Sequence, residues 1–125
     1  MNNSQLLKGT LEGCVLLVIS QQEFYGYELV TKLQQLGFLD LSAGTVYPLL
    51  QKLERQGYLK SQLRASSEGP RRKYYDLTTS GQRQIQNFIT DWQQLTATVT
   101  AVIEQTGGSK DGAIERKKIT SCAKN

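Results

Sequence analysis

The chain has 125 residues, which is enough for one compact domain and one long helix that buries a face against a partner. Its formal net charge is +4 and it contains no histidine, so Ser-His and Cys-His nucleophile pairs are excluded and the commonest metal ligand is missing. The carboxylates stand singly along helical stretches, and we therefore expect a protein that is not an enzyme and holds neither a metal nor a cofactor.

The charge is distributed unevenly. Residues 1–106 carry ten Lys and Arg against nine Asp and Glu, whereas residues 107–125 carry five against two. Any basic patch on the folded part must therefore be local. No run of about 18 apolar residues is present, and the N-terminus lacks the basic start of a secretory signal. We expect a cytoplasmic protein without a membrane partner, and Cys14 and Cys122 suggest no disulfide framework.

The first two helices follow from apolar spacing. Residues Leu6 to Ile19 predict a helix that is buried on most sides, and a loop around Gln21 to Phe24 ends it. A second helix is predicted from Gly26 to a stop at Gly37. Its expected apolar face consists of Leu29, Val30, Leu33 and Leu36.

A third helix is predicted between Ser42, as its N-cap, and Gly57. Pro48 lies past the first turn and cannot donate a backbone hydrogen bond, so we expect an irregular start. The inward positions, at spacings of three and four, are Val46, Leu49, Leu50 and Leu53.

A hairpin and a long helix follow. Tyr58 to Arg64 and Arg71 to Leu77 are predicted strands around a turn-rich segment, with Tyr75 facing inward and Tyr74 on the side of Arg72. Thr78 or Thr79 is the expected cap of the last helix. Its apolar seam is Ile85, Phe88, Trp92, Leu95, Val99 and Val102.

These elements predict a mainly α fold with a two-stranded β-hairpin, a winged helix-turn-helix with a long C-terminal helix. We expect a DNA-binding domain over residues 5–78, a dimerisation helix over 79–106 and a disordered basic tail over 107–125. The last seam positions extend beyond what a small domain can cover. A second copy of the chain would cover them, and a two-fold dimer would bind a pseudo-palindromic DNA site.

The third helix and the hairpin are the candidate DNA surface. Small and hydrogen-bonding residues near the start of the helix suit a major groove, and the basic hairpin suits phosphates. Taken alone, a basic triplet is often a solvated strand edge, and a tyrosine pair in a strand is often packing. The alternative function is therefore a winged-helix module that binds another protein without DNA.

Four stretches resemble one known family. They are LLKGTLEGCVLLVI from Leu6, YGYEL from Tyr25, GTVYPLLQKLERQGYL from Gly44 and GPRRKYYDLTTSG from Gly69. Together they resemble the PadR family of transcriptional regulators over about residues 5–105, in the form with one C-terminal helix found in multidrug-responsive repressors. The resemblance implies a homodimeric repressor that binds double-stranded DNA and is released from it by a small molecule.

The resemblance also implies a ligand site. In multidrug-responsive members a tryptophan of the C-terminal helix faces its symmetry mate, and planar aromatic molecules stack between the two indoles. Trp92 occupies the matching place, with Phe88, Leu95 and Cys14 as neighbours; ordinary dimer packing is the alternative role of Trp92. Some relatives have a carboxylate one turn later, but this chain has Thr96.

The complete candidate sets are as follows. The DNA contacts are Tyr25, Tyr27, Ser42, Gly44, Thr45, Tyr47, Pro48, Gln51, Lys52, Arg64, Arg71, Arg72, Lys73 and Tyr74. The dimer contacts are Leu6, Ile85, Phe88, Trp92, Leu95, Val99 and Val102.

Overall fold

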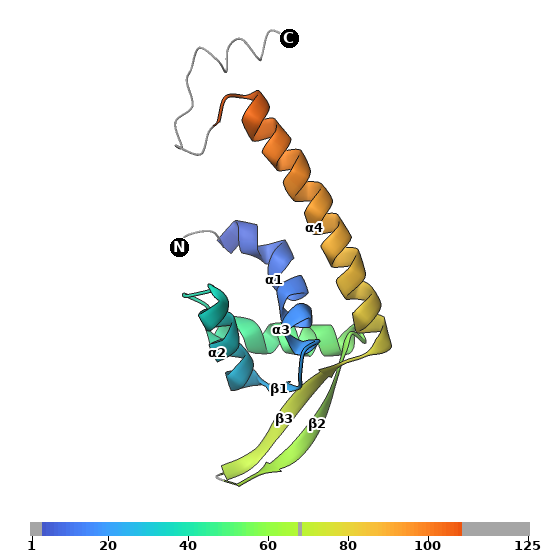
Figure 1. Ribbon diagram of the computed structural model, residues 1–125. Coiled ribbons are helices and arrows are strands. Elements are labelled where there is room, and N and C mark those ends of the chain that lie inside the picture. Colours follow the sequence, from blue (N-terminus) through green and yellow to red (C-terminus); the bar gives the residue numbers. More distant parts are fainter. Residues whose placement is uncertain (1–3, 68, 109–125) are drawn as a thin grey trace. The chain divides into compact units, whose positions relative to one another are not determined.

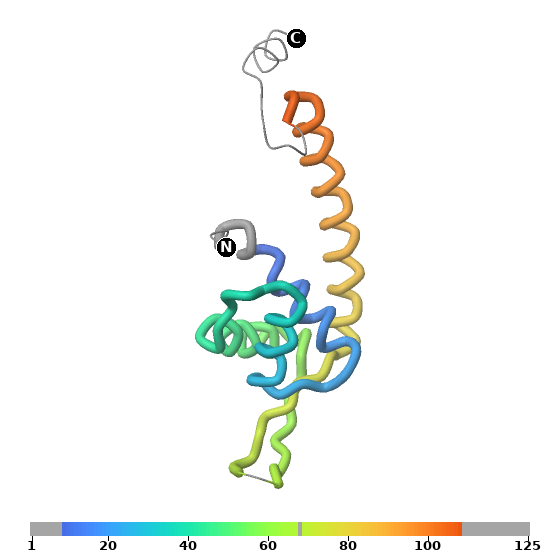
Figure 2. The backbone as a smooth tube through the Cα atoms, turned by 60° about the vertical axis from the view of Figure 1, so that its left-hand side comes forward, coloured from blue at the N-terminus to red at the C-terminus, as the bar shows by residue number. Residues whose placement is uncertain are grey.

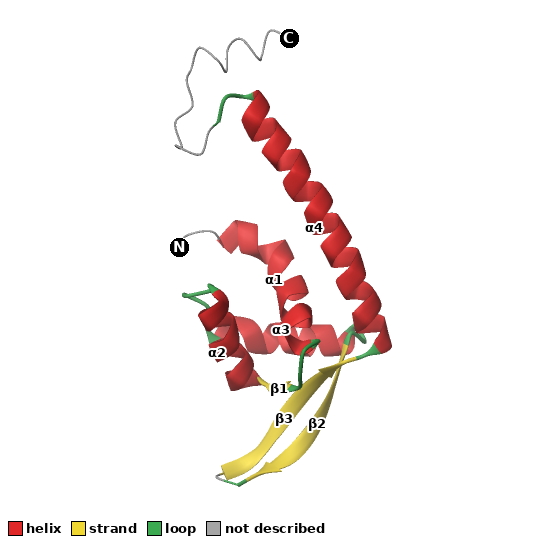
Figure 3. Cartoon of the chain, in the orientation of Figure 1, coloured by secondary structure: helices red, strands yellow, loops and turns green. Residues whose placement is uncertain are grey.

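The computed structural model describes residues 4–67 and 69–108, with side chains from residue 9 onward. The side chain of Leu6 and all of the predicted tail beyond Gly108 lie outside the described residues. Four helices and three strands follow one another along the chain (Figures 1 and 3). They are α1 (Ser4–Ile19), β1 (Phe24–Tyr25), α2 (Gly26–Leu36), α3 (Ala43–Arg55), β2 (Leu59–Ser66), β3 (Gly69–Leu77) and α4 (Thr79–Gln105).

The core lies where α1, α2 and α3 pack on one another. The inward positions of the predicted third helix are confirmed, because Val46, Leu50 and Leu53 are fully buried and Leu49 is half-buried. The face predicted for the second helix is wrong at one position, since Leu36 is 58% exposed. The other fully buried side chains are Val15, Leu16, Ile19, Leu29 and Leu33.

The predicted helix ends are confirmed at two glycines. Gly37 has a φ of 130°, and the N–H of the next residue, Phe38, donates to the carbonyl of Leu33 at 3.0 Å. Gly57 has a φ of 85° and stands at the end of α3 in the same way. Residues that carry a side chain rarely adopt a backbone conformation with positive φ, so glycine is suited to the end of each helix.

The two predicted caps behave differently. The Thr78 hydroxyl accepts a hydrogen bond from the N–H of Gly81 at 3.0 Å and donates one to the carbonyl of Gly57 at 2.6 Å. Ser42 stands at the N-cap position of α3, but its side chain makes no capping hydrogen bond. Its carbonyl accepts the N–H of Thr45 and of Val46, each at 3.1 Å, as is common at the first turn of a helix. The irregular start predicted from Pro48 is not seen, because α3 is a regular α-helix from Ala43 to Arg55 with Pro48 inside it.

The hairpin belongs to a three-stranded antiparallel sheet in the order β1-β3-β2. The sequence predicts a loop around Gln21 to Phe24, because a strand of two residues leaves no alternating pattern. In the structure β1 is a strand that pairs with β3, with Phe24 opposite Tyr75 and Tyr25 opposite Tyr74. Tyr75 is buried, as predicted, and lies on the same side as buried Phe24. Figures 1 and 2 show the hairpin reaching beyond the three helices, so its tip is open to solvent.

α4 is one continuous helix, but the chain divides into two compact units between Phe88 and Ile89. In the first unit Ile85 is buried, and the Phe88 ring lies so close to Gly13 of α1 that a Cβ there would overlap it. In the second unit the remaining seam residues are exposed: Trp92 by 44%, Leu95 by 57%, Val99 by 47% and Val102 by 54%. None of the described helices is long and apolar enough to cross a membrane.

Candidate nucleic-acid interface

The outer face of α3 presents the residues predicted for it. Because Val46, Leu50 and Leu53 turn inward, the intervening positions turn outward. The exposed residues are Ser42, Gly44, Thr45, Tyr47, Pro48, Gln51 and Lys52. This face combines an open backbone at Gly44, hydroxyls and an amide, which are the groups that read base edges and phosphates.

Tyr47 fixes how α3 meets the start of α2. Its ring lies over Gly26, where a Cβ would come within 2.5 Å of the ring atom Cε1. Glycine is therefore required at the first residue of α2 for this contact. The ring remains 43% exposed, and Tyr27 next to the contact is 65% exposed. Both predicted tyrosine contacts thus lie at the surface near the junction of the two helices.

One face of the sheet carries a cluster of guanidinium groups and tyrosines, which we call the arginine–tyrosine cluster: Tyr25, Arg64, Arg72 and Tyr74. The two tyrosine rings meet edge to face with centroids 5.5 Å apart. Arg72 lies 4.3 Å above the Tyr25 ring and Arg64 lies 5.0 Å above the Tyr74 ring. Such cation–π contacts stabilise by about 0.5–1 kcal/mol at exposed sites and hold the cations in place.

The cluster changes the expected role of Tyr74. The ring is half-buried under Arg64 and against Tyr25, so its face is engaged within the sheet. The guanidinium groups, rather than the tyrosine rings, form the outer layer.

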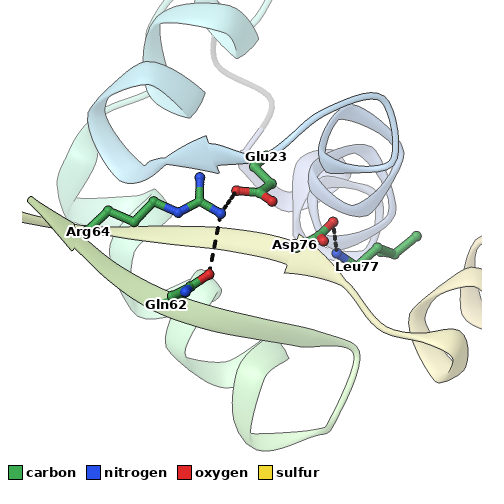
Figure 4. A network of polar contacts seen from close by, with 5 residues as sticks. All are labelled: Glu23, Gln62, Arg64, Asp76 and Leu77. Carbon is green, nitrogen blue, oxygen red and sulfur yellow. Dashed lines mark hydrogen bonds and ion pairs between the residues drawn. The ribbon is translucent and has the colours of Figure 1, made fainter.

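The Arg64 guanidinium also meets a carboxylate that the sequence did not indicate. Its Nη2 atom lies 2.5 Å from Oε2 of Glu23 and 3.3 Å from Oε1 of Gln62. Figure 4 shows Arg64 with its guanidinium between these two side chains. Glu23 stands just before β1, so the pairing of β1 with β3 brings it to the cluster.

Lys73 belongs to the other face of the sheet. Its ammonium lies 2.9 Å from Oε1 of Glu54 on α3 and 5.4 Å above the Tyr75 ring. The second carboxylate oxygen of Glu54 accepts a hydrogen bond from the Ser61 hydroxyl at 2.5 Å. The Ser61 hydrogen bond, and then Lys73, lower the pKa of Glu54; Glu54 in turn raises the pKa of Lys73.

Ion pairs therefore separate the predicted basic contacts into two groups. Lys52, Arg64 and Lys73 each face one carboxylate, namely Glu12, Glu23 and Glu54 respectively. Arg71 and Arg72 are exposed and form no ion pair with a carboxylate of the described residues. Among the predicted basic contacts on the hairpin of β2 and β3, which we call the wing, the two without a described carboxylate partner thus both lie on β3.

The predicted ligand residues are divided between the two units: Cys14 and Phe88 belong to the first, and Trp92 and Leu95 to the second. Cys14 is half-buried and lines a hollow of about 390 Å³ between α1 and α2. Burial raises the pKa of its thiol, so the sulfur stays protonated near neutral pH. Phe88 packs on Gly13, and neither Trp92 nor Leu95 is among the residues of the hollow.

Thr96 stands one turn after Trp92. Its hydroxyl donates to the carbonyl of Trp92 at 2.8 Å. The Thr96 side chain is therefore a neutral group that is hydrogen-bonded to its own helix.

A helix-turn-helix made of α2 and α3, with the outer face of α3 exposed and a basic hairpin following it, defines a winged-helix DNA-binding protein. The model of the transcriptional regulator PadR-like family matches residues 15–87, and the chain belongs to this family. A PadR-like transcriptional regulator from Bacillus cereus strain ATCC 14579 is 46% identical, with a TM-score of 0.72 over 79% of this chain and 96% of that one.

Two further solved structures agree. A Streptococcus transcriptional regulator is 47% identical, with a TM-score of 0.71 over 78% of this chain and 96% of that one. A PadR family regulator from Eggerthella lenta DSM 2243 is 35% identical, with a TM-score of 0.74 over 80% and 87%.

Membership confirms the family, the winged-helix fold and the class of function predicted from the sequence. PadR-like proteins are DNA-binding transcriptional regulators and not enzymes, so the chain is a transcriptional regulator that binds DNA. A winged-helix module that binds only protein is the less favoured reading.

Proposed function

We propose that the chain is a homodimeric repressor that binds a pseudo-palindromic operator and leaves it when a planar aromatic molecule binds at the dimer interface. The observation that carries the dimer is the exposed apolar seam of α4, formed by Trp92, Leu95, Val99 and Val102. Burying the exposed part of each such side chain against a second copy is worth roughly 1 kcal/mol. In a two-fold dimer the same side chains of both chains would be buried, so each chain would contribute this free energy.

For DNA, we propose that the outer face of α3 enters the major groove and the wing follows the phosphates. The first part is supported by the outer face of α3, which is exposed at Gly44, Thr45 and Gln51, whereas the opposite face of the helix is buried. Arg71 and Arg72 support the second part, because no described carboxylate pairs with them. Residues 5–78 would act as the DNA-binding part and residues 79–106 as the dimerisation helix.

For the ligand, we propose that the two Trp92 side chains of the dimer hold a planar aromatic molecule between them. The Trp92 side chain is 44% exposed in the single chain, so part of its surface can be covered by such a molecule. Phe88, Leu95 and Cys14 would be its neighbours. Because Thr96 is neutral and bonded to its own helix, this site would select for flat aromatic shape more than for positive charge. Packing of the indoles against each other is the competing role.

Sedimentation tests the dimer. The wild-type chain should sediment as a dimer at micromolar concentration, and Val99→Asp should sediment as a monomer. Thr100→Asp is the matched control, since it places the same charge on the neighbouring exposed position outside the seam. A monomeric wild type, or equal effects of the two substitutions, would contradict the proposed interface.

Fluorescence tests the ligand site. Trp92 is the single tryptophan of the sequence, so its emission reports on this position alone. Planar aromatic dyes should quench it and saturate at one dye per dimer, and Trp92→Ala should lose dye binding while it remains dimeric. Absence of quenching at micromolar dye would leave dimer packing as the role of the indole.

A further inference from the structure

We propose that Glu23 competes with DNA phosphate for Arg64 and so lowers the affinity of the wing for DNA of any sequence. The inference rests on the DNA interface proposed above. Oε2 of Glu23 lies 2.5 Å from Nη2 of Arg64 and is shielded from water. The side chains as a whole remain 37% and 43% exposed, so a phosphate can approach the cation that the carboxylate now covers.

Two contacts besides the one with Glu23 hold Arg64. Its guanidinium also lies above the Tyr74 ring and within 3.3 Å of Oε1 of Gln62. Arg72 is the direct cross-strand partner of Arg64 in the sheet register. Like charges at such a position repel each other, and a nearby anion relieves the repulsion. In the free chain Glu23 is this anion, as Figure 4 shows. On DNA a phosphate can serve the same purpose.

Glu23 differs from the carboxylate that pairs with Lys73. Glu54 also accepts the Ser61 hydroxyl, so it links α3 to β2 and contributes to the fold. Within the described residues, Oε2 of Glu23 has no hydrogen-bond partner besides its ion pair with Arg64. Neutralising Glu23 should therefore change the charge of the cluster with little effect on stability.

The test compares Glu23→Gln with the wild type on a labelled duplex of unrelated sequence. Exposed ion pairs contribute about 0.2–1 kcal/mol, so Glu23→Gln should bind about 1.5- to 5-fold more tightly at 0.1 M salt. The plot of log K against log salt should become steeper by up to about 0.9, the value of one added phosphate contact.

Asp76→Asn is the matched control. It removes the same charge from β3, and the asparagine oxygen can still accept the N–H of Leu77, which Oδ1 of Asp76 accepts at 2.8 Å. We expect a smaller gain in affinity from Asp76→Asn than from Glu23→Gln. In an Arg64→Gln background, Glu23→Gln should give no gain, because the cation for which it competes is gone.

Three results would overturn the proposal: an unchanged or weaker Glu23→Gln, an equal gain from Asp76→Asn, or a gain that persists without Arg64. Urea unfolding of Glu23→Gln checks that the variant is folded. If the wild type bound no duplex at any salt concentration, the proposed interface and the role of Glu23 would both be wrong. Salt-dependent binding by the wild type with no gain in Glu23→Gln would refute only the role of Glu23.

Discussion

Removing either of two adjacent cations of β3, Arg72 or Lys73, should affect DNA binding to different extents. Arg72 lies above the Tyr25 ring and has no described carboxylate partner, whereas the Lys73 ammonium lies 2.9 Å from Glu54 on α3. From the sequence alone, both residues were predicted to contact phosphate. The structure leads us to expect that Arg72→Ala weakens DNA binding far more than Lys73→Ala does.

The size of the effect follows from counterion release. One phosphate contact contributes about 0.9 to the slope of log K against log salt, so at 0.1 M salt, relative to 1 M, it is worth about eightfold in affinity. Arg72→Ala should lose about this factor for each copy of the chain on the DNA. Lys73 already shares its charge with Glu54, so Lys73→Ala should lose less than about twofold and leave the slope almost unchanged.

Fluorescence anisotropy of a labelled duplex between about 50 and 200 mM salt covers the range where such slopes are measured. Urea unfolding of both variants separates a loss of contact from a loss of fold. Equal slopes for Arg72→Ala and the wild type, or a larger change for Lys73→Ala, would show that the Glu54 ion pair does not remove Lys73 from the interface.

Further predictions concern stability. Gly13→Ala should destabilise the fold by about 1–3 kcal/mol, because the added Cβ overlaps the Phe88 ring. Gly9→Ala in the same helix meets nothing within 4 Å and should stabilise by about 0.5–1 kcal/mol; equal urea midpoints would contradict the contact. The pKa of Glu54 is lowered in the folded chain, so its contribution is complete above the unfolded pKa and is lost as pH falls through the folded value. The difference in urea midpoint between the wild type and Glu54→Gln should therefore shrink below about pH 4, and a difference that grew in acid would refute this sign.

Features encoded by neighbouring residues were predictable. The helix stops at Gly37 and Gly57 need one residue type with a special backbone conformation, and the cap at Thr78 needs one hydroxyl next to a helix start. Periodicity likewise gave the buried face of α3. The length of the last helix also predicted the change from buried Ile85 to exposed Trp92 along its apolar seam.

The carboxylates of the interface were not predictable in this way. Glu12 pairs with Lys52 across 40 positions of the chain, and Glu23 reaches Arg64 only because a two-residue strand adds to the hairpin. A basic stretch read along the sequence counts its own charges and omits those that the fold brings beside it. For the same reason the sequence overestimated the freedom of Tyr74, whose ring meets Tyr25 from another strand.

The contact between Tyr47 and Gly26 has a consequence for any attempt to exchange segments with a relative. Gly26 lies in the YGYEL stretch and Tyr47 in the GTVYP stretch, 21 positions further along the chain, yet the ring of one fills the space that a side chain on the other would need. The two stretches are halves of one joint between α2 and α3. A chimaera that takes α3 from a protein with a smaller residue at position 47 would lose the ring over Gly26, and one that takes α2 with a larger residue at position 26 would displace the Tyr47 ring. Transplanting the groove-reading helix therefore requires moving the first turn of α2 with it.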